Sequence, residues 1–295
     1  MKTAAQKTAA LDPSAGDRLP YAGHLDDHTV MTRGGDLIQM IQVDGVAFET
    51  ADSETLNHMA AVRDVVMRGI ANSSLMLYCH VIRRQVTAEL SGAQPDGFVR
   101  DLDDAWQQQL RGKKLYINDM VLMLVRRPAQ GKIGFFDRLT KWGNGTRNSA
   151  ERLADQTREL RELDAARTNL LSALSRYGPR LLGRYHDANG TCSEPLEILS
   201  ALYNGEMQPV LEPTGDAGQY LPYKRISFGL DALELKGASA ITSRFGAIVS
   251  IKDYPAYTAP GMLDNLLRLP HELTMTESFA FIDRQIADER IGLAL

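Results

Sequence analysis

The chain has 295 residues, and 33 lysines and arginines against 37 aspartates and glutamates give it a formal net charge of −4 at neutral pH. The 44% hydrophobic and 24% charged fractions are typical of folded globular proteins, which excludes a disordered, collagen-like or disulfide-scaffold chain. The mildly negative charge also gives no global electrostatic reason to expect nucleic-acid binding.

The first part of the chain alternates strand and helix patterns. Residues 1–20 lack such a pattern and are expected to form a flexible leader. In chain order we predict strands at Thr29–Arg33, Asp36–Asp44, Ser74–Arg83 and Lys114–Arg126, and helices at Ser53–Ile70 and Phe98–Leu110. Asp52 or Ser53 is placed to cap the first helix. Together these elements predict a first α+β unit over residues 21–127.

The segment from Arg126 to Arg147 breaks this pattern, because basic and aromatic residues are interleaved in it. Six lysines and arginines against one aspartate give it a local charge of +5. Positive charge beside exposed aromatic rings can bind anionic lipid headgroups or an acidic segment of a partner protein. The residues expected to make this contact are Lys132, Phe135, Phe136, Arg138, Lys141 and Trp142. The alternative is a solvated loop whose aromatic side chains pack back onto the core.

A helical connector and a second mixed unit follow. Residues 149–177 predict a long charged helix with a leucine stripe from Leu153 to Leu174 and an Arg158–Glu162 pair on its polar side. With the basic loop and a helix at Glu194–Tyr203, it forms a connector over residues 128–219. A second α+β unit is predicted over residues 220–295. Its expected strands are Arg225–Phe228, Ala232–Leu235, Phe245–Ile251 and Leu273–Ile282, and its expected helix is Met262–Leu269. The predicted fold class is α+β, with two strand-helix-strand units of mainly antiparallel sheets joined by a long charged helix.

Most sequence signatures of catalysis are absent. The chain has no Gly-x-x-x-x-Gly-Lys-Ser/Thr phosphate loop, no Gly-x-Ser-x-Gly turn and no His-Glu-x-x-His or Cys-x-x-Cys pair. His24, Asp26 and His28 alternate, so an extended chain would project all three from one face, where they could hold zinc or iron. Further ligands would have to come from elsewhere in the fold. No catalytic, cofactor-binding or metal-ligating residue is therefore assigned, and a stand-alone metal-dependent enzyme stays an alternative.

Several short motifs resemble those of one family. Near the end of the chain they are Ile251-Lys252-Asp253-Tyr254-Pro255, Pro260-Gly261-Met262-Leu263, the run from Leu266 to Glu272 with its Leu-Pro-His-Glu turn, and Ser278-Phe279-Ala280-Phe281. They are similar to the N-terminal region of the VirB/TrbE/CagE family of type IV secretion ATPases. The front of the chain resembles the opening hairpin and first β-α-β of that family, at Tyr21, His24, the strand around Thr32 and Asp36, Asp44-Gly45 and His80 to Arg84. The stretch from Leu199 to Glu206 resembles its Leu-x-Asn-Gly segment. The resemblance covers about residues 20–290.

The resemblance implies a docking and assembly role. In this family a C-terminal motor domain with a phosphate loop and a Walker-B acidic residue binds and hydrolyses ATP, and neither motif is present in this sequence. The chain is therefore expected to be the N-terminal docking and assembly domain of a type IV secretion (conjugation) ATPase that powers pilus biogenesis and substrate translocation. The intact protein would use ATP and magnesium, while this segment would hold no cofactor and would be inactive alone.

The resemblance also implies partners and a location. It implies a peripheral protein on the cytoplasmic face of the bacterial inner membrane, in contact with inner-membrane components of the secretion system and with copies of itself. Peripheral membrane contact would then involve the +5 segment. A nucleic-acid-handling adaptor that uses this segment is a further alternative, but the rest of the chain carries −9 and would repel phosphates, so no direct nucleic-acid binding is expected. For His24 the family pattern implies a structural role in an opening hairpin.

Overall fold

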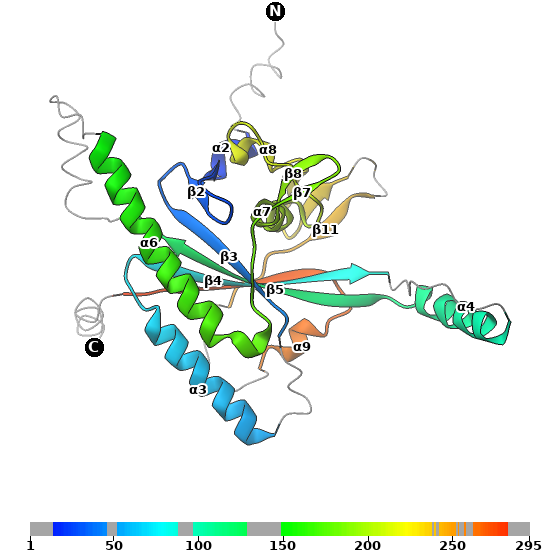
Figure 1. Cartoon of the computed structure of the whole chain (residues 1–295). Coiled ribbons are helices and arrows are strands. Elements are labelled where there is room, and N and C mark those ends of the chain that lie inside the picture. The colour runs from blue at the N-terminus through cyan, green and yellow to red at the C-terminus, as the bar shows by residue number, and fades with distance from the viewer. Residues whose placement is uncertain are drawn as a thin grey trace, which may run out of the picture.

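An antiparallel sheet forms the centre of the molecule (Figure 1). The computed structural model describes residues 14–45, 52–87, 97–128, 149–237, 239, 242–251, 253, 257 and 262–282. The strands lie in the order β1 (Tyr21–His24), β2 (Val30–Thr32), β3 (Leu37–Val43), β5 (Leu115–Arg126), β4 (Leu75–Val86) and β12 (Leu273–Ala280), and β6 (Arg180–Leu181) also pairs with β3. All of these pairs are antiparallel, and the predicted α+β class is confirmed.

The two faces of the central sheet lie in two different hydrophobic cores. On β3, Leu37 and Ile41 belong to one core, while Ile38 and Met40 belong to the other. Each of these four side chains is at most 4% exposed. Because successive side chains of a strand point to opposite faces, a strand covered on both sides needs a nearly unbroken apolar run. The sequence has such a run at this position, which is why this strand was predictable.

Helices cover both faces of the sheet (Figure 1). One face carries α3 (Ser53–Gly69) and α6 (Ser149–Ala173), and the other carries α7 (Glu194–Asn204) and α8 (Ala217–Tyr220). The predicted cap of α3 is present, since Asp52 Oδ1 accepts a hydrogen bond from the Thr55 amide at 2.6 Å. In the described part of the chain, no helix combines the length and apolar character that crossing a membrane requires.

Residues 14–20 differ from the flexible leader expected over residues 1–20. They contain the short helix α2 (Ala15–Arg18), which begins with reciprocal hydrogen bonds between Ser14 and Asp17. α2 packs against α8, where Gln219 Nε2 donates to Asp17 Oδ1 at 2.7 Å. Polar contacts with residues far away in the sequence therefore hold residues 14–20 in place, and no local pattern could reveal such contacts. Residues 1–13 lie outside the described part of the chain.

The strands of the predicted second unit lie in two sheets. β9 (Arg225–Phe228), β10 (Leu233–Lys236) and β11 (Arg244–Gly246) form a small antiparallel sheet in the order β11-β10-β9. The final strand, β12, joins the central sheet instead and pairs with β4 from Leu273↔Arg83 to Ala280↔Met76. A local pattern shows that a strand forms, but its partner depends on which edge the rest of the fold leaves open.

Several elements are also shorter than predicted or were not predicted. The strand expected at Phe245–Ile251 is the three-residue β11, and the helix expected at Met262–Leu269 is a single turn, α9 (Asp264–Leu267). The connector additionally contains a two-stranded sheet of β7 (Arg184–Asp187) and β8 (Gly190–Ser193). A one-turn 3₁₀ helix at Ser175–Tyr177 follows α6.

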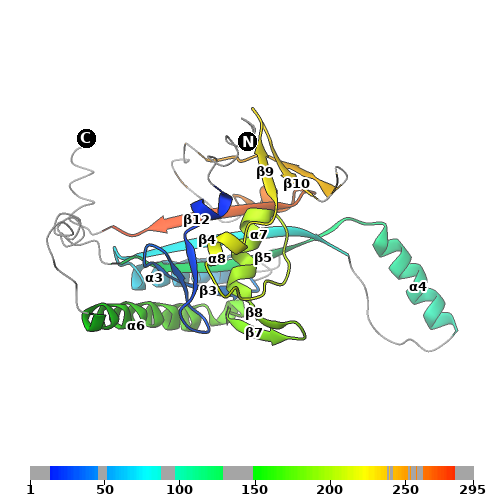
Figure 2. The same ribbon diagram turned by 90° about the horizontal axis from the view of Figure 1, so that it is seen from above.

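β4 and β5 continue beyond the sheet as a two-stranded ribbon with a helix at its end (Figure 2). Their pairing extends to Val86↔Leu115, whereas β12 reaches only Arg83. The helix between the two strands is α4 (Phe98–Arg111), and none of its residues is buried. We call the outer ribbon and this helix the arm (Arg84–Val86, α4 and Leu115–Ile117).

Candidate functional site

The predicted contact segment lies largely outside the described residues. Lys132, Phe135, Phe136, Arg138, Lys141 and Trp142 all fall there, so their role stays a prediction. Arg126, the first residue of the basic segment, ends β5 and is only 5% exposed. Its Nη2 lies 2.8 Å from Glu162 Oε2 on α6, in place of the expected Arg158–Glu162 pair, and Arg158 pairs with Asp155. Arg126 therefore joins the sheet to α6 and does not contribute to a basic surface.

His24, Asp26 and His28 are held in hydrogen bonds within the fold. His24 Nδ1 lies 2.9 Å from the Asp26 carbonyl oxygen, and His24 Nε2 lies 2.6 Å from Ser193 Oγ at the start of α7. The Asp26 carboxylate accepts from the amides of His28 and Thr29 and from the Thr29 hydroxyl. These bonds shape the turn between β1 and β2. Among the described residues, no group of three or more His, Cys, Asp or Glu side chains is arranged to hold a metal ion.

Another histidine, His80, is buried in the central sheet. His80 on β4 is 4% exposed and lies between Val121 of β5 and Thr276 of β12. Its Nδ1 is 2.9 Å from Thr276 Oγ1, and its ring stacks on Tyr78. Burial lowers the pKa of His80 below its usual value, because the charged imidazolium loses hydration there. Burial likewise lowers the pKa of His24.

We expect the free energy of unfolding to fall as the pH drops below about 6.5. Above that pH both folded and unfolded chains hold His80 neutral, whereas below it the unfolded chain binds a proton before the folded chain does. His80→Asn keeps a polar group toward Thr276 and removes this titration. Its free energy of unfolding, from urea titrations, should therefore decrease less between about pH 7.5 and about pH 5.5.

The control for this pH dependence is His58→Asn, which changes an exposed position on α3. That variant should keep the pH dependence of the parent chain. Identical slopes of stability against pH for the parent and both variants would contradict the prediction, since His80 would then contribute nothing.

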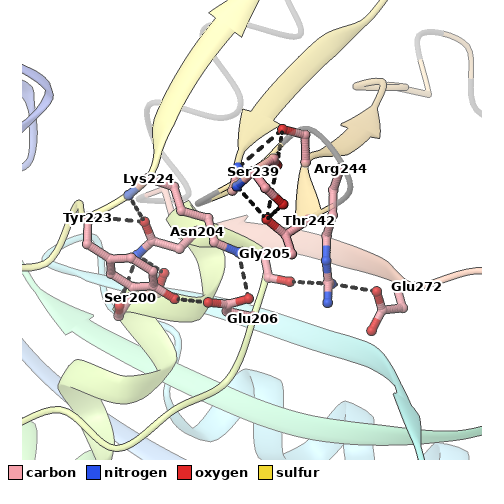
Figure 3. A network of polar contacts seen from close by, with 12 residues as sticks. Ser200, Asn204, Gly205, Glu206, Tyr223, Lys224, Ser239, Thr242, Arg244 and Glu272 are labelled. Carbon is pink, nitrogen blue, oxygen red and sulfur yellow. Dashed lines mark hydrogen bonds and ion pairs between the residues drawn. The ribbon is translucent and has the colours of Figure 1, made fainter.

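Asn204 organises a buried polar network at the end of α7 (Figure 3). Its side chain is 0% exposed. The Nδ2 group donates to Ser200 O, Ser200 Oγ and Leu221 O at 2.9–3.0 Å. The Oδ1 atom accepts from the amides of Tyr223 and Lys224 at 3.2 and 3.0 Å. One asparagine side chain thus forms hydrogen bonds both with groups at the end of α7 and with the amides that begin the segment leading into β9.

The two residues after Asn204 extend this network toward the small sheet. Gly205 adopts a left-handed conformation, with φ of 70°, and its amide donates to Ala201 O at 2.8 Å, which ends α7. Glu206 accepts from the Tyr223 hydroxyl and pairs with Lys224 Nζ, both at 2.6 Å (Figure 3). Burial, followed by the hydrogen bond to Glu206, raises the pKa of Tyr223 and keeps its proton in place.

Arg244 links this helix end to the central sheet (Figure 3). From β11, its Nη1 donates to Gly205 O at 3.1 Å and to Glu272 Oε2 at 2.5 Å. The other carboxylate oxygen, Glu272 Oε1, accepts from the Gln85 amide on β4 at 3.2 Å. Arg244 and Glu272 are each about two-fifths exposed, so their ion pair alone stabilises the fold only weakly. Its importance is that it connects three segments that are far apart in the sequence.

The residues just before Glu272 hold the base of the arm. Leu269 O accepts from Arg83 Nε at 2.9 Å, and Pro270 O accepts from the Tyr116 hydroxyl at 2.8 Å. The Arg83 guanidinium also lies over the Tyr116 ring, 4.7 Å from its centroid. We call the connected set Asn204–Glu206, Arg244 and Leu269–Glu272 the junction. It fixes the outer ribbon against α7 and the small sheet, and its chemistry is that of a structural connection.

Two family models match the chain on either side of the long helix α6. Residues 28–133 match the N-terminal domain of the type IV secretion system ATPase VirB4/TrbE. Residues 180–292 match the CagE, TrbE, VirB family, described as a component of a type IV transporter system. The chain thus belongs to the VirB4/TrbE family and represents an N-terminal segment of it.

Curated relatives agree along nearly the whole chain. The type IV secretion system protein virB4 of Bartonella henselae is 30% identical over 280 residues, which cover 94% of this chain and 35% of that protein. Protein virB4 of Agrobacterium fabrum is 32% identical over 278 residues, or 93% of this chain and 34% of that protein. The virB4 protein of Brucella suis is 29% identical over 278 residues, or 92% and 33%. The chain therefore spans about a third of the length of these relatives.

The junction brings together two of the motifs that carried the family resemblance. Asn204-Gly205 comes from the Leu-x-Asn-Gly segment, and the stretch from Leu269 to Glu272 is the Leu-Pro-His-Glu turn. The sequence showed both motifs but gave no sign that they meet. The connecting residue, Arg244, belongs to neither motif, and a lone arginine at the start of a short strand carries no signal that could have identified it.

Proposed function

We propose that this chain is the docking and assembly domain of a type IV secretion ATPase, the conjugation type that powers pilus biogenesis and substrate translocation. Family membership over nearly the whole chain is the observation that carries this proposal. The domain would lie on the cytoplasmic face of the inner membrane as a peripheral component. Its partners would be inner-membrane components of the secretion system and further copies of the same protein.

One feature of the sequence supports a division of labour in which this chain docks and another part of the protein binds ATP. In P-loop ATPases a loop of backbone amides with a lysine holds the nucleotide phosphates, and the sequence has no such motif. ATP and magnesium would therefore be bound by another part of a longer protein. The family resemblance implies that this part is a C-terminal motor domain. The contribution of this chain would be mechanical, because a two-core sheet with a braced junction can hold a motor in a fixed orientation.

Nucleotide binding gives the first test. We expect the purified 295-residue chain to show no ATP hydrolysis and no heat of binding when it is titrated with ATP and magnesium. A virB4 relative of full length, titrated under the same conditions, is the positive control. Stoichiometric ATP binding by the chain itself would contradict the proposed division of labour.

Docking is tested separately with inner-membrane extracts. A tagged chain should retain membrane components from detergent extracts of cells that carry a type IV secretion system and retain none of them from cells that lack it. Replacing Phe135, Phe136 and Trp142 with serine tests the basic and aromatic segment, because flotation of the chain with anionic liposomes should then decrease. If the parent chain neither retains secretion components nor floats, the docking role fails.

A further inference from the structure

The arm exposes an apolar stripe along α4. Phe98, Leu102 and Trp106, which are four residues apart, are 78%, 58% and 54% exposed, and Val99 is 49% exposed. Side chains at this spacing line one side of a helix. Since none of the residues of α4 is buried, the stripe is not part of either core of this chain. A helix with one apolar side in water is typically completed by a partner.

The charges along the arm helix are divided between its two ends. Its first half holds Asp101, Asp103 and Asp104 against Arg100 and is therefore net acidic, whereas Arg111, Lys113 and Lys114 lie at its end and just beyond it. Only residues 112–114 separate α4 from β5, so the basic end lies next to the ribbon. The acidic end is then at the tip, about 20 Å further out at 1.5 Å per residue.

We propose that α4 pairs with α4 of a second copy of this chain, in antiparallel orientation. In that arrangement the two apolar stripes cover each other, and the acidic tip of each helix lies beside the basic base of the other. A parallel pair would instead place acidic tip against acidic tip and basic base against basic base. The charge division therefore favours α4 of a second copy as the partner, because that helix carries the complementary pattern. It also favours the antiparallel orientation.

The position of α4 in the fold allows this pairing. The ribbon carries α4 away from the sheet and its covering helices (Figure 2). Two arms that overlap fully would leave the two bodies at opposite ends of the helix pair. The contact is isologous, so it closes as a dimer and leaves no α4 stripe exposed.

A membrane surface is less suited to the same stripe. Helices that lie on anionic membranes carry lysines and arginines along their polar side, whereas α4 itself has three aspartates against two arginines. Each aspartate near such a surface would be repelled by the lipid headgroups. A second copy satisfies both the apolar and the charged residues.

The helix pair alone is expected to be a weak dimer. Two helices of 14 residues offer less contact than the roughly 1,200–2,000 Å² of a standard stable interface. Sedimentation of the 295-residue chain should therefore show a monomer–dimer equilibrium that depends on concentration. This inference names a surface for the self-association in the proposed function, but it can fail while nucleotide and docking tests succeed, because those tests do not involve α4.

Removing the stripe tests the interface. Leu102→Ser with Trp106→Ser should raise the dissociation constant of the dimer by about tenfold or more. Circular dichroism and thermal unfolding should stay close to those of the parent, since both side chains are exposed. Gln108→Ser, on the polar side of the same helix, is the matched control and should leave the equilibrium unchanged. A parent chain that stays monomeric at every concentration, or a stripe variant that dimerises like the parent, overturns the proposal.

Charge reversal tests the orientation. A variant with Asp101→Lys and Asp103→Lys carries positive charge at both ends of the arm helix, and one with Lys113→Asp and Lys114→Asp carries negative charge at both ends. Each variant alone should dimerise less than the parent, and an equimolar mixture should recover the dimer as a heterodimer. Recovery should weaken with added salt. Dimerisation that charge reversal leaves unchanged would overturn the antiparallel arrangement.

Discussion

Replacing Asn204 with alanine is expected to lower the free energy of unfolding by about 3 kcal/mol. The side chain is fully buried and bonds to the end of α7 and to the two amides that begin the segment before β9. Alanine would leave the amides of Tyr223 and Lys224 without an acceptor, and each such loss costs about 1–3 kcal/mol. Guanidinium titrations followed by circular dichroism would measure the change.

The matched control is Asn57→Ala, at an exposed position in α3. Because alanine favours a helix more than asparagine does, this variant should be as stable as the parent or slightly more stable. If Asn204→Ala and Asn57→Ala unfold at the same denaturant concentration, Asn204 does not organise the junction in the way that its hydrogen bonds indicate.

Leu163→Ala should have an effect of similar size on the opposite face of the sheet, about 3 kcal/mol. Leu163 is 0% exposed and lies in the core that joins α6 to β3, β4 and β5. The substitution removes buried methyl groups and leaves a cavity between the helix and the sheet, and the sheet is also held by pairing on both sides of β5, so little collapse is expected. The change would be measured as the shift of the unfolding midpoint in guanidinium.

The same helix supplies the comparison. Leu153 was placed in the same leucine stripe from the sequence, yet it is 65% exposed. Leu153→Ala should therefore change the free energy of unfolding by less than about 0.5 kcal/mol. Equal losses for the two leucine substitutions would mean that α6 packs along a different face from the one described.

The elements that could be predicted are those whose signal is local. The run of apolar residues in β3 and the cap at Asp52 both act within a few residues, so the strand and the start of α3 were found close to their observed positions. In α6 the stripe was also correct from Leu160 onward, since Leu163 and Leu170 are buried and Leu160 packs against them. Leu153, near the start of the helix, departs from it, since its side chain is 65% exposed.

The features that could not be predicted depend on distant partners. β12 was recognised as a strand, but its place beside β4 depends on which sheet edge is open. Glu162 was expected to pair with Arg158 on its own helix, yet it pairs with Arg126, whose burial makes a nearby carboxylate necessary. Arg244 bridges Gly205 and Glu272 across the fold, and no spacing rule relates these residues.

The direction of β12 determines how the sheet would respond to mechanical load. β12 begins opposite Arg83, beside the arm, and ends opposite Met76 at the other end of the sheet (Figure 2). A pull on the chain that follows β12, with the arm held in place, acts along the strand and stresses it in shear. All rungs of the β4–β12 ladder then share the force, whereas a pull at right angles would peel them apart one at a time. A strand anchored in this way can transmit tension between the arm and whatever follows the sheet without being unzipped.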